Sequence, residues 1–241
     1  MIFGRRKKDR KNLKFSVTEG NRTSYIESVS KMRILGVHID EDLSWDSHVK
    51  SVKSKTYNII RNLARTTSVL PLKAKKQLYD ALVTPHFSYC DTVWGGLSKR
   101  ASADLQKAGN FAAKSMLGLR KRASATQALI KLNMMPLEEK RRVHLGVLVH
   151  KLRNNIGPTQ LVKRYNDMAI SRHQHNTRFR ARGDMVAVTH NSTRYERCTL
   201  IRATQTWNSI PGHIRNLDNS SNFKRKYQAH LLDVFKNEVQ H

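Results

Sequence analysis

Long hydrophobic runs are absent from this 241-residue sequence, and so is a cysteine framework. The best apolar run, residues 145–149, lies between His144 and His150 and is far shorter than the roughly 20 residues that a membrane-spanning helix needs. Two cysteines, Cys90 and Cys198, are too few for a disulfide scaffold and suit a reducing compartment. A basic cluster from Arg5 to Lys11, rather than an apolar signal segment, lies near the start of the chain. We therefore expect a nuclear or cytoplasmic protein that is neither secreted nor bound to a membrane.

Acidic residues are also scarce, with 18 Asp and Glu against 45 Lys and Arg, which gives a formal net charge of +27. The excess is spread along the chain: 10 basic against 3 acidic residues in 1–39, 16 against 9 in 40–139, and 19 against 6 in 140–241. Seven Phe, seven Tyr and three Trp argue against a disordered basic tail. A folded surface this positive is typical of a protein that meets a polyanion, so the expected partner is the backbone of RNA or DNA. No small-molecule substrate is predicted.

The N-terminal part has the alternating pattern of β-strands. Apolar and polar residues alternate over residues 13–17, resume at 25–29, and form a third extended run at 32–39. Residues 19–22 (Glu-Gly-Asn-Arg) are typical of a tight turn, because Gly and Asn tolerate positive φ. The pattern predicts a small antiparallel β meander.

Beyond Ser44 the apolar period becomes helical. Helices are predicted at 44–63, 71–83, 98–117, 123–132, 136–157 and 222–237, with Gly95 and Gly96 as a break and residues 185–189 as one further candidate strand. The predicted fold class is α+β, predominantly α. The predicted parts are a β segment at 1–42, a helical bundle at 43–157, and a mixed basic region at 158–241 that ends in a helix.

The residues needed for independent catalysis are missing from the pattern. Two-metal nucleotide transfer needs a close pair of carboxylates, and no adjacent Asp-Asp is present. The dense acidic run at 40–42 is interpreted as a strand end before a helix N-terminus, and a metal site is the less favoured alternative. A zinc site built from His173, His175 and Cys198 would lack the paired spacings of a closed site. We predict no catalytic, cofactor-binding or metal-binding residue.

The candidate nucleic-acid-binding residues lie in four basic clusters. Two interpretations of the N-terminal cluster have equal weight. One is a localisation signal or a phosphate contact, and the other is a solvated loop. The cluster at 140–142 falls at a predicted helix start, where cations are unfavourable, and this favours an external anion. Three arginines that alternate over 178–182 would share one face of an extended segment. The predicted contacts are Arg5, Arg6, Lys7, Lys8, Arg10, Lys11, Arg120, Lys121, Arg122, Arg141, Arg142, Arg178, Arg180 and Arg182.

An ordered set of motifs resembles one family over nearly the whole chain. The motifs are ILGVHID at 34–40, LSW at 43–45, LYDALVTPHFSYCD at 78–91, VWG at 93–95, LQKAGN at 105–110, MMPL at 134–137, and WNSIP at 207–211. In this order they resemble the C-terminal part of reverse transcriptases from non-LTR retrotransposons of the jockey-like group.

The resemblance implies a thumb and tail that lie after the polymerase palm. Residues 1–42 would be a residual palm-edge segment and 43–157 a thumb-like bundle, while the family's paired catalytic aspartates would lie upstream of Met1. The parent enzyme is an RNA-directed DNA polymerase that uses Mg²⁺, but this chain alone is expected to be inactive and to hold no cofactor. Its implied partners are a template–primer duplex or element RNA, and the missing palm and fingers. The alternative is a basic scaffold fragment that docks onto a missing catalytic half or another protein.

Overall fold

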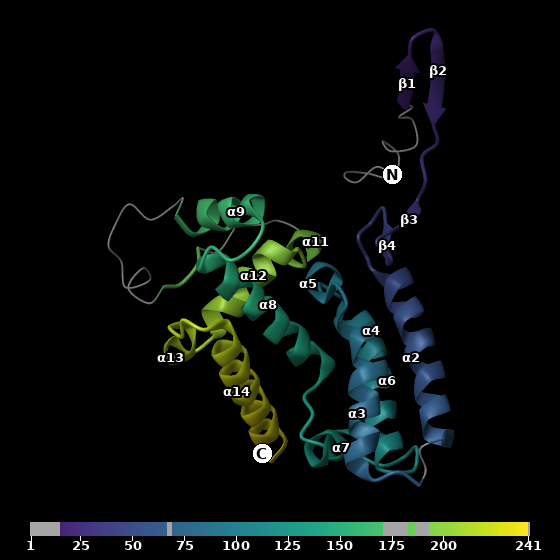
Figure 1. Cartoon of the computed structure of the whole chain (residues 1–241), viewed down its shortest axis with the longest axis vertical. Helices are drawn as coiled ribbons and strands as arrows, with labels where there is room; N and C mark the ends of the chain where they lie inside the picture. Colours follow the sequence, from purple (N-terminus) through teal and green to yellow (C-terminus); the bar gives the residue numbers. More distant parts are fainter. Residues whose placement is uncertain (1–14, 67–68, 171–182, 187–192, 241) are drawn as a thin grey trace. The chain divides into compact units, whose positions relative to one another are not determined.

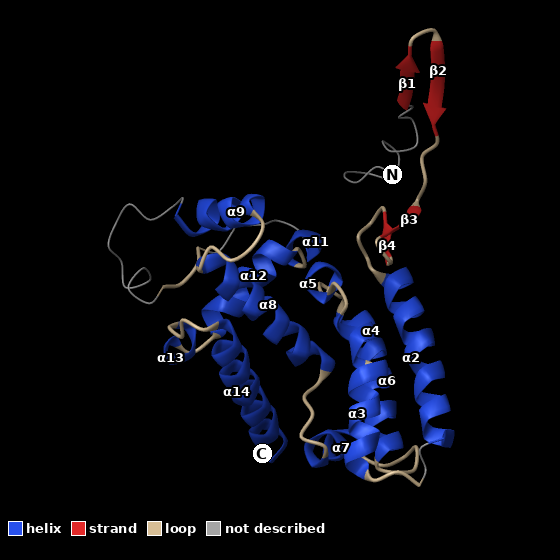
Figure 2. Ribbon diagram, in the orientation of Figure 1, coloured by secondary structure: helices blue, strands red, loops and turns tan. Residues whose placement is uncertain are grey.

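The computed structural model describes residues 15–66, 69–170, 183–186 and 193–240. Strands occupy the N-terminal part of this range and helices nearly all of the rest (Figures 1 and 2), which confirms the predicted α+β, predominantly α class. The chain divides into two compact units, 1–54 and 55–241, and the division falls within helix α2 (Asp46–Thr66).

The strands of the first unit form two separate antiparallel pairs. β1 (Phe15–Glu19) pairs with β2 (Arg22–Ile26) across the predicted Gly20-Asn21 turn, in a register that sets Glu19 opposite Arg22. β3 (Lys31–Ile34) pairs with β4 (Val37–Asp40). The single strand predicted at 32–39 is therefore wrong, because Leu35 and Gly36 take φ values of +44° and +85° and turn the chain back on itself. When both residues of a two-residue turn have positive φ, the twist of the turn matches the twist of the flanking strands.

Asp40 connects the second hairpin to α2. Its Oδ1 accepts hydrogen bonds from the backbone N–H groups of Asp42 and Ser44, and its Oδ2 accepts from the Ser44 hydroxyl and the Trp45 N–H. The carboxylate is buried and satisfies the donors of the turn that leads into the helix. This is the structural role that the sequence predicts for the acidic run at 40–42.

The second unit is a series of helices whose starts follow local sequence signals. Pro71 and Pro136 directly precede α3 and α8, while the hydroxyls of Ser98 and Ser124 accept N–H bonds in the first turns of α6 and α7. The helices are α3 (Leu72–Leu82), α4 (Thr84–Ser88), α5 (Asp91–Trp94), α6 (Lys99–Met116), α7 (Ala125–Lys131), α8 (Leu137–Arg153), α9 (Thr159–Ile170), α11 (Thr193–Glu196), α12 (Thr199–Ser209), α13 (Gly212–Arg215) and α14 (Ser220–Gln240).

Helix α8 organises the core of this unit. It contacts α12, α14 and α9, and it also contacts α4, α5 and α6 (Figure 1). His150 of α8 stacks on Phe223 of α14 with ring centroids 4.4 Å apart, and Phe223 stacks in turn on Trp207 of α12. These fully buried aromatic side chains fix three helices that are far apart in the sequence.

The strand predicted at 185–189 is not formed by its described residues, 185 and 186. The backbone N–H and C=O of Met185 instead bond to the side-chain amide of Asn208 on α12, at 2.8 and 2.9 Å. Because this amide satisfies both backbone groups, Met185 can be buried in the core without a partner strand.

Candidate nucleic-acid interface and an arginine-lined cavity

Two of the predicted basic clusters lie outside the described residues. These are the N-terminal cluster at 5–11 and the alternating arginines at 178–182. The cluster Arg120, Lys121 and Arg122 lies in the loop between α6 and α7, and all three residues are exposed. Lys114 of α6 extends to the same loop, since its Nζ donates to the carbonyl of Lys121 at 2.9 Å. The α6–α7 loop therefore presents a compact group of positive charge.

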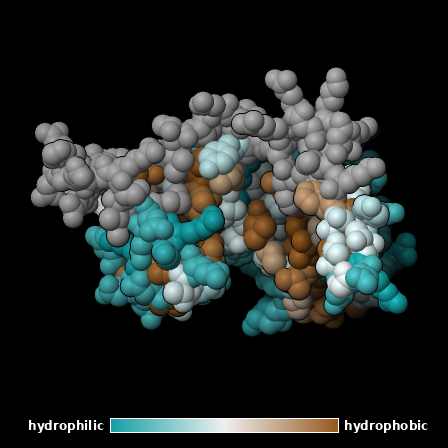
Figure 3. All heavy atoms as spheres, turned by 90° about the horizontal axis from the view of Figure 1, so that it is seen from above, coloured by the Kyte–Doolittle hydropathy of each residue, from teal (hydrophilic) through white to brown (hydrophobic). Residues whose placement is uncertain are grey.

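A second exposed basic run was not among the binding clusters predicted from the sequence. Lys224, Arg225 and Lys226 lie near the start of α14, and all three residues are exposed. The three consecutive basic residues were the signal that could have identified this cluster. Figure 3, which shows one face, has hydrophilic side chains over much of the described surface, with apolar areas between them.

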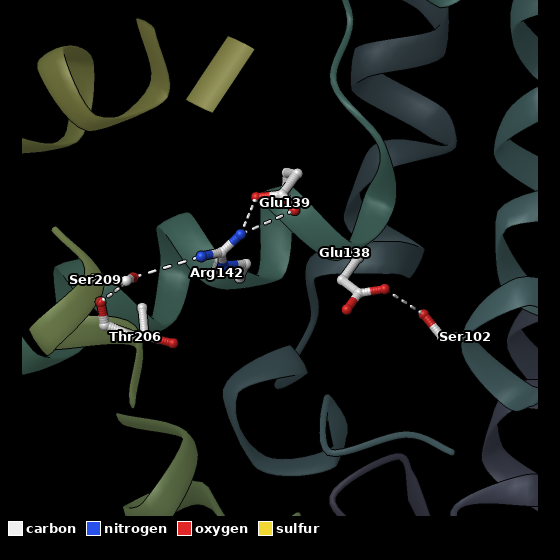
Figure 4. Close-up of polar contacts among 6 residues, drawn as sticks. All are labelled: Ser102, Glu138, Glu139, Arg142, Thr206 and Ser209. Carbon is white, nitrogen blue, oxygen red and sulfur yellow. Dashed lines mark hydrogen bonds and ion pairs between the residues drawn. The ribbon is translucent and has the colours of Figure 1, made fainter. Parts of the chain in front are cut away.

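Arg141 and Arg142 are neighbours on α8 but have different surroundings. Arg142 donates through Nη1 to both carboxylate oxygens of Glu139, at 3.1 and 2.9 Å, and through Nη2 to the Ser209 hydroxyl (Figure 4). Burial lowers the pKa of Arg142, but the Glu139 carboxylate outweighs it and the net shift is upward. The charge of Arg142 is thus already neutralised within the protein.

Arg141 is 4% exposed and has no ion pair among the described residues. Its Nη2 donates to the Ser102 hydroxyl of α6 at 2.8 Å, and that hydroxyl donates to Glu138 at 3.2 Å (Figure 4 shows the second bond). Burial lowers the pKa of Arg141. The external anion predicted for this cluster therefore concerns Arg141 rather than Arg142.

Arg141 lies on the wall of a cavity of about 680 Å³. The first turns of α6 and α8, the outer face of α12 and the α5–α6 loop surround it. Five cations against two carboxylates line it: Lys99, Arg141, Arg142, Arg197 and Arg202 against Glu138 and Glu196. The N-terminal turns of the two long helices add the positive ends of their dipoles to this excess.

Arg202 of α12 is the least satisfied of these cations. Its Nη1 is buried and has no hydrogen-bond partner in the described part of the chain. Burial, followed by the nearby positive charge of Arg141, lowers the pKa of Arg202 to about 10. Sequence reasoning missed Arg202, because it is an isolated arginine in a helix and no local pattern marks it.

Gly95 and Gly96 allow α12 to approach this closely. A Cβ on Gly95 would lie 2.3 Å from the Asp91 carbonyl and 2.8 Å from Nη2 of Arg202. A Cβ on Gly96 would lie 2.0 Å from the carbonyl of Arg197. The predicted break at Gly95-Gly96 is confirmed, and its physical reason is the close packing of two backbones.

No group of three or more His, Cys, Asp or Glu side chains among the described residues could hold a metal ion. Asp91 is buried and paired with Nδ1 of His144 at 2.5 Å. No helix in the described part is long and apolar enough to cross a membrane.

No protein-family model matches the chain, and no curated protein or solved structure is detectably similar to it.

Proposed function

We propose that this chain binds the phosphate backbone of nucleic acid through distributed Lys and Arg contacts. The observation that carries the proposal is the exposed positive charge on the second unit. None of the six cations at 120–122 and 224–226 forms an ion pair within the described residues. Unpaired cations on a surface of this net charge repel one another. The phosphates of a polyanion neutralise these cations, and the release of the polyanion's condensed counterions favours binding.

The family resemblance supports a more specific form of this proposal. The chain would be the thumb and tail of a retroelement reverse transcriptase without a catalytic centre of its own. Its ligand would be a template–primer duplex or element RNA, held by backbone and shape rather than by base edges. A primer-extension assay with Mg²⁺ and this chain alone is expected to give no product, and templated extension would contradict this form of the proposal.

Salt dependence of binding to an RNA–DNA hybrid tests the backbone contacts. We expect affinity to fall linearly on a double-logarithmic plot as salt rises. Replacing Arg120, Lys121 and Arg122 with Gln should flatten that slope by up to about 3, because each lost phosphate contact removes about 1. No detectable binding of the wild-type chain at low salt would rule out the proposal.

A matched control leaves the net charge unchanged. Lys107 and Asp104 form an exposed ion pair at 3.1 Å on α6. The double variant Asp104→Asn, Lys107→Gln removes both charges and should keep the wild-type slope. An unchanged slope in the triple variant would show that the α6–α7 loop does not contact phosphate.

A second candidate function is docking onto another protein, and the β1–β2 hairpin favours it. Every residue of both strands is exposed. Phe15, Val17 and Ile26 lie on one face, since Phe15 is opposite Ile26 and Val17 is two residues along, and each is more than half exposed. Open strand edges beside an apolar face are typical of pairing surfaces. If the purified chain is a monodisperse monomer that melts cooperatively, self-association through this hairpin is rejected, and the result counts against an exposed pairing edge.

A further inference from the structure

The arginine-lined cavity has an excess of positive charge that Asp91 and Glu138 offset only in part, since the pKa of Arg141 and that of Arg202 are both lowered on balance. Arg142 is neutralised by Glu139, which leaves the buried Arg141 and the half-buried Arg202 as the cations of the cavity that lie deepest in the fold. Neither forms an ion pair among the described residues. Asp91 is paired with His144, and Glu138 accepts its hydrogen bond from Ser102 rather than from a guanidinium.

Leaving a buried guanidinium hydrogen without an acceptor is costly. A buried donor that has lost water and gained no partner destabilises the fold, and a charged donor does so more strongly. Nη1 of Arg202 is such a donor, and Arg141 adds like-charge repulsion at short range. The arrangement is explained if an anion from outside the protein supplies the acceptor.

Contacts with neighbouring residues fix the positions of the two arginine side chains. Gly95 leaves the space that Nη2 of Arg202 occupies, and the Ser102 hydroxyl orients Nη2 of Arg141. The Thr199 hydroxyl donates to the carbonyl of Thr92 at 3.0 Å and joins the start of α12 to α5. Side chains held from three helices form a preorganised site, because their rotamers are fixed before a ligand arrives.

We propose that this cavity binds a terminal phosphate group of a nucleic-acid strand, with Arg141 and Arg202 as its ligands. A terminal phosphomonoester carries close to two negative charges at neutral pH, whereas an internal backbone phosphate carries one. Two guanidiniums match the dianion in charge, and each offers a planar fork of donors to its oxygens. The cavity volume of about 680 Å³ also leaves room for the attached nucleoside.

The inference rests on the proposed nucleic-acid binding only for the source of the phosphate. The test uses one DNA oligonucleotide in two forms, with a 5′-phosphate or a 5′-hydroxyl, and measures the affinity of the full chain for each at physiological ionic strength. We expect the phosphorylated form to bind about tenfold more tightly, the effect of a single good charge-assisted contact. Inorganic phosphate should abolish that preference at concentrations that leave binding of the hydroxyl form unchanged.

Arg202→Met should reduce the preference to less than about twofold, because methionine keeps the apolar stem and removes the donors. Arg100→Met is the matched control, since Arg100 is exposed near the start of α6 and does not line the cavity. It should keep the preference. Arg202→Lys, which retains the charge but not the fork, should keep an intermediate preference and guards against a folding defect in the methionine variant.

Equal affinity of the wild-type chain for both oligonucleotides would overturn the inference and leave the proposed backbone binding standing. A preference that survives in Arg202→Met would also overturn it. Binding of inorganic phosphate, measured directly by calorimetry, to a chain that binds neither oligonucleotide would reject nucleic acid as the source of the phosphate and overturn the inference in this form.

Discussion

Arg215 and Arg202 belong to the same unit, yet within the described residues only Arg215 has a counter-ion. Arg215 of α13 is 7% exposed, and its Nη1 donates to Oδ1 of Asp184 at 2.5 Å. Its Nε lacks an acceptor, but the carboxylate neutralises its charge. Arg202 has a buried Nη1 with no acceptor in the described part of the chain and a second arginine beside it.

The difference separates a structural cation from a binding cation. A buried charge with its partner in place is self-contained, and the fold loses stability when either partner is removed. A buried charge without a partner costs stability in the free protein and is relieved only by a ligand. Mutation at the paired site should therefore lower the free energy of unfolding, and mutation of the unpaired arginine should raise it.

The largest expected effect comes from turning the paired site into an unpaired one. Asp184→Ala leaves Arg215 buried without its carboxylate, and we expect a loss of about 3–5 kcal/mol in the free energy of unfolding. Urea unfolding followed by circular dichroism measures this loss. Asp218→Ala, at an exposed position without a hydrogen bond in the described part, should change stability by less than about 0.5 kcal/mol. A small effect of Asp184→Ala would remove the contrast between the two arginines.

At the cavity, we expect a substitution to increase the free energy of unfolding. Arg202→Met removes an unpaired donor and its repulsion with Arg141, so the free chain should gain about 2 kcal/mol in phosphate-free buffer. Arg215→Met, the same substitution at the paired site, should destabilise because it leaves Asp184 buried alone. Thermal melting of both variants beside the wild type measures the two signs. If both variants lose stability, Arg202 is a structural cation and the comparison fails.

A negative charge should meet the same penalty in this interior. Tyr79 of α3 is 2% exposed, and burial, followed by the charge of Asp80, raises the pKa of its phenol. Because the folded state holds the proton more tightly than the unfolded state, this contribution is complete below pH 10 and is lost as pH rises above 10. Tyr79→Phe should therefore lose less stability than the wild type in this range, by about 1.4 kcal/mol per pH unit.

Urea unfolding at pH 9, 10 and 11 measures the alkaline effect. Tyr25→Phe serves as the control, since Tyr25 is 77% exposed on β2. It should follow the wild-type curve. Parallel curves for all three proteins would show that Tyr79 does not resist ionisation.

Much of the fold follows from local sequence signals. The Gly20-Asn21 turn predicts the first hairpin, and Ser98 and Pro136 mark helix starts. The apolar period predicts α2, α3, α6, α7, α8 and α14, but not α9 or α12 in the basic region after residue 157. These signals act over a few residues, so they can be read along the chain. The second hairpin was missed because Leu35, a residue that rarely adopts positive φ, stands in its turn.

The candidate site divides in the same way. The sequence shows that Arg141 and Arg142 stand at a helix start, where they look equivalent. In the fold both line the cavity, but only Arg142 forms an ion pair with Glu139. Arg202 is 61 residues further along the chain than Arg141 and has no local motif. Packing of α12 against Gly95 and Gly96 brings the two together.

The sequence by itself determined the scarcity of acidic residues, the net charge of +27 and the helical class, because composition and periodicity are properties of the chain alone. These predict a polyanionic partner. Only the tertiary structure decided which cations have a protein counter-ion, since ion pairs and burial arise from contacts between distant segments. The fold pairs Arg142 with Glu139 and Arg215 with Asp184, whereas Arg141 and Arg202 have no ion pair in the described part of the chain.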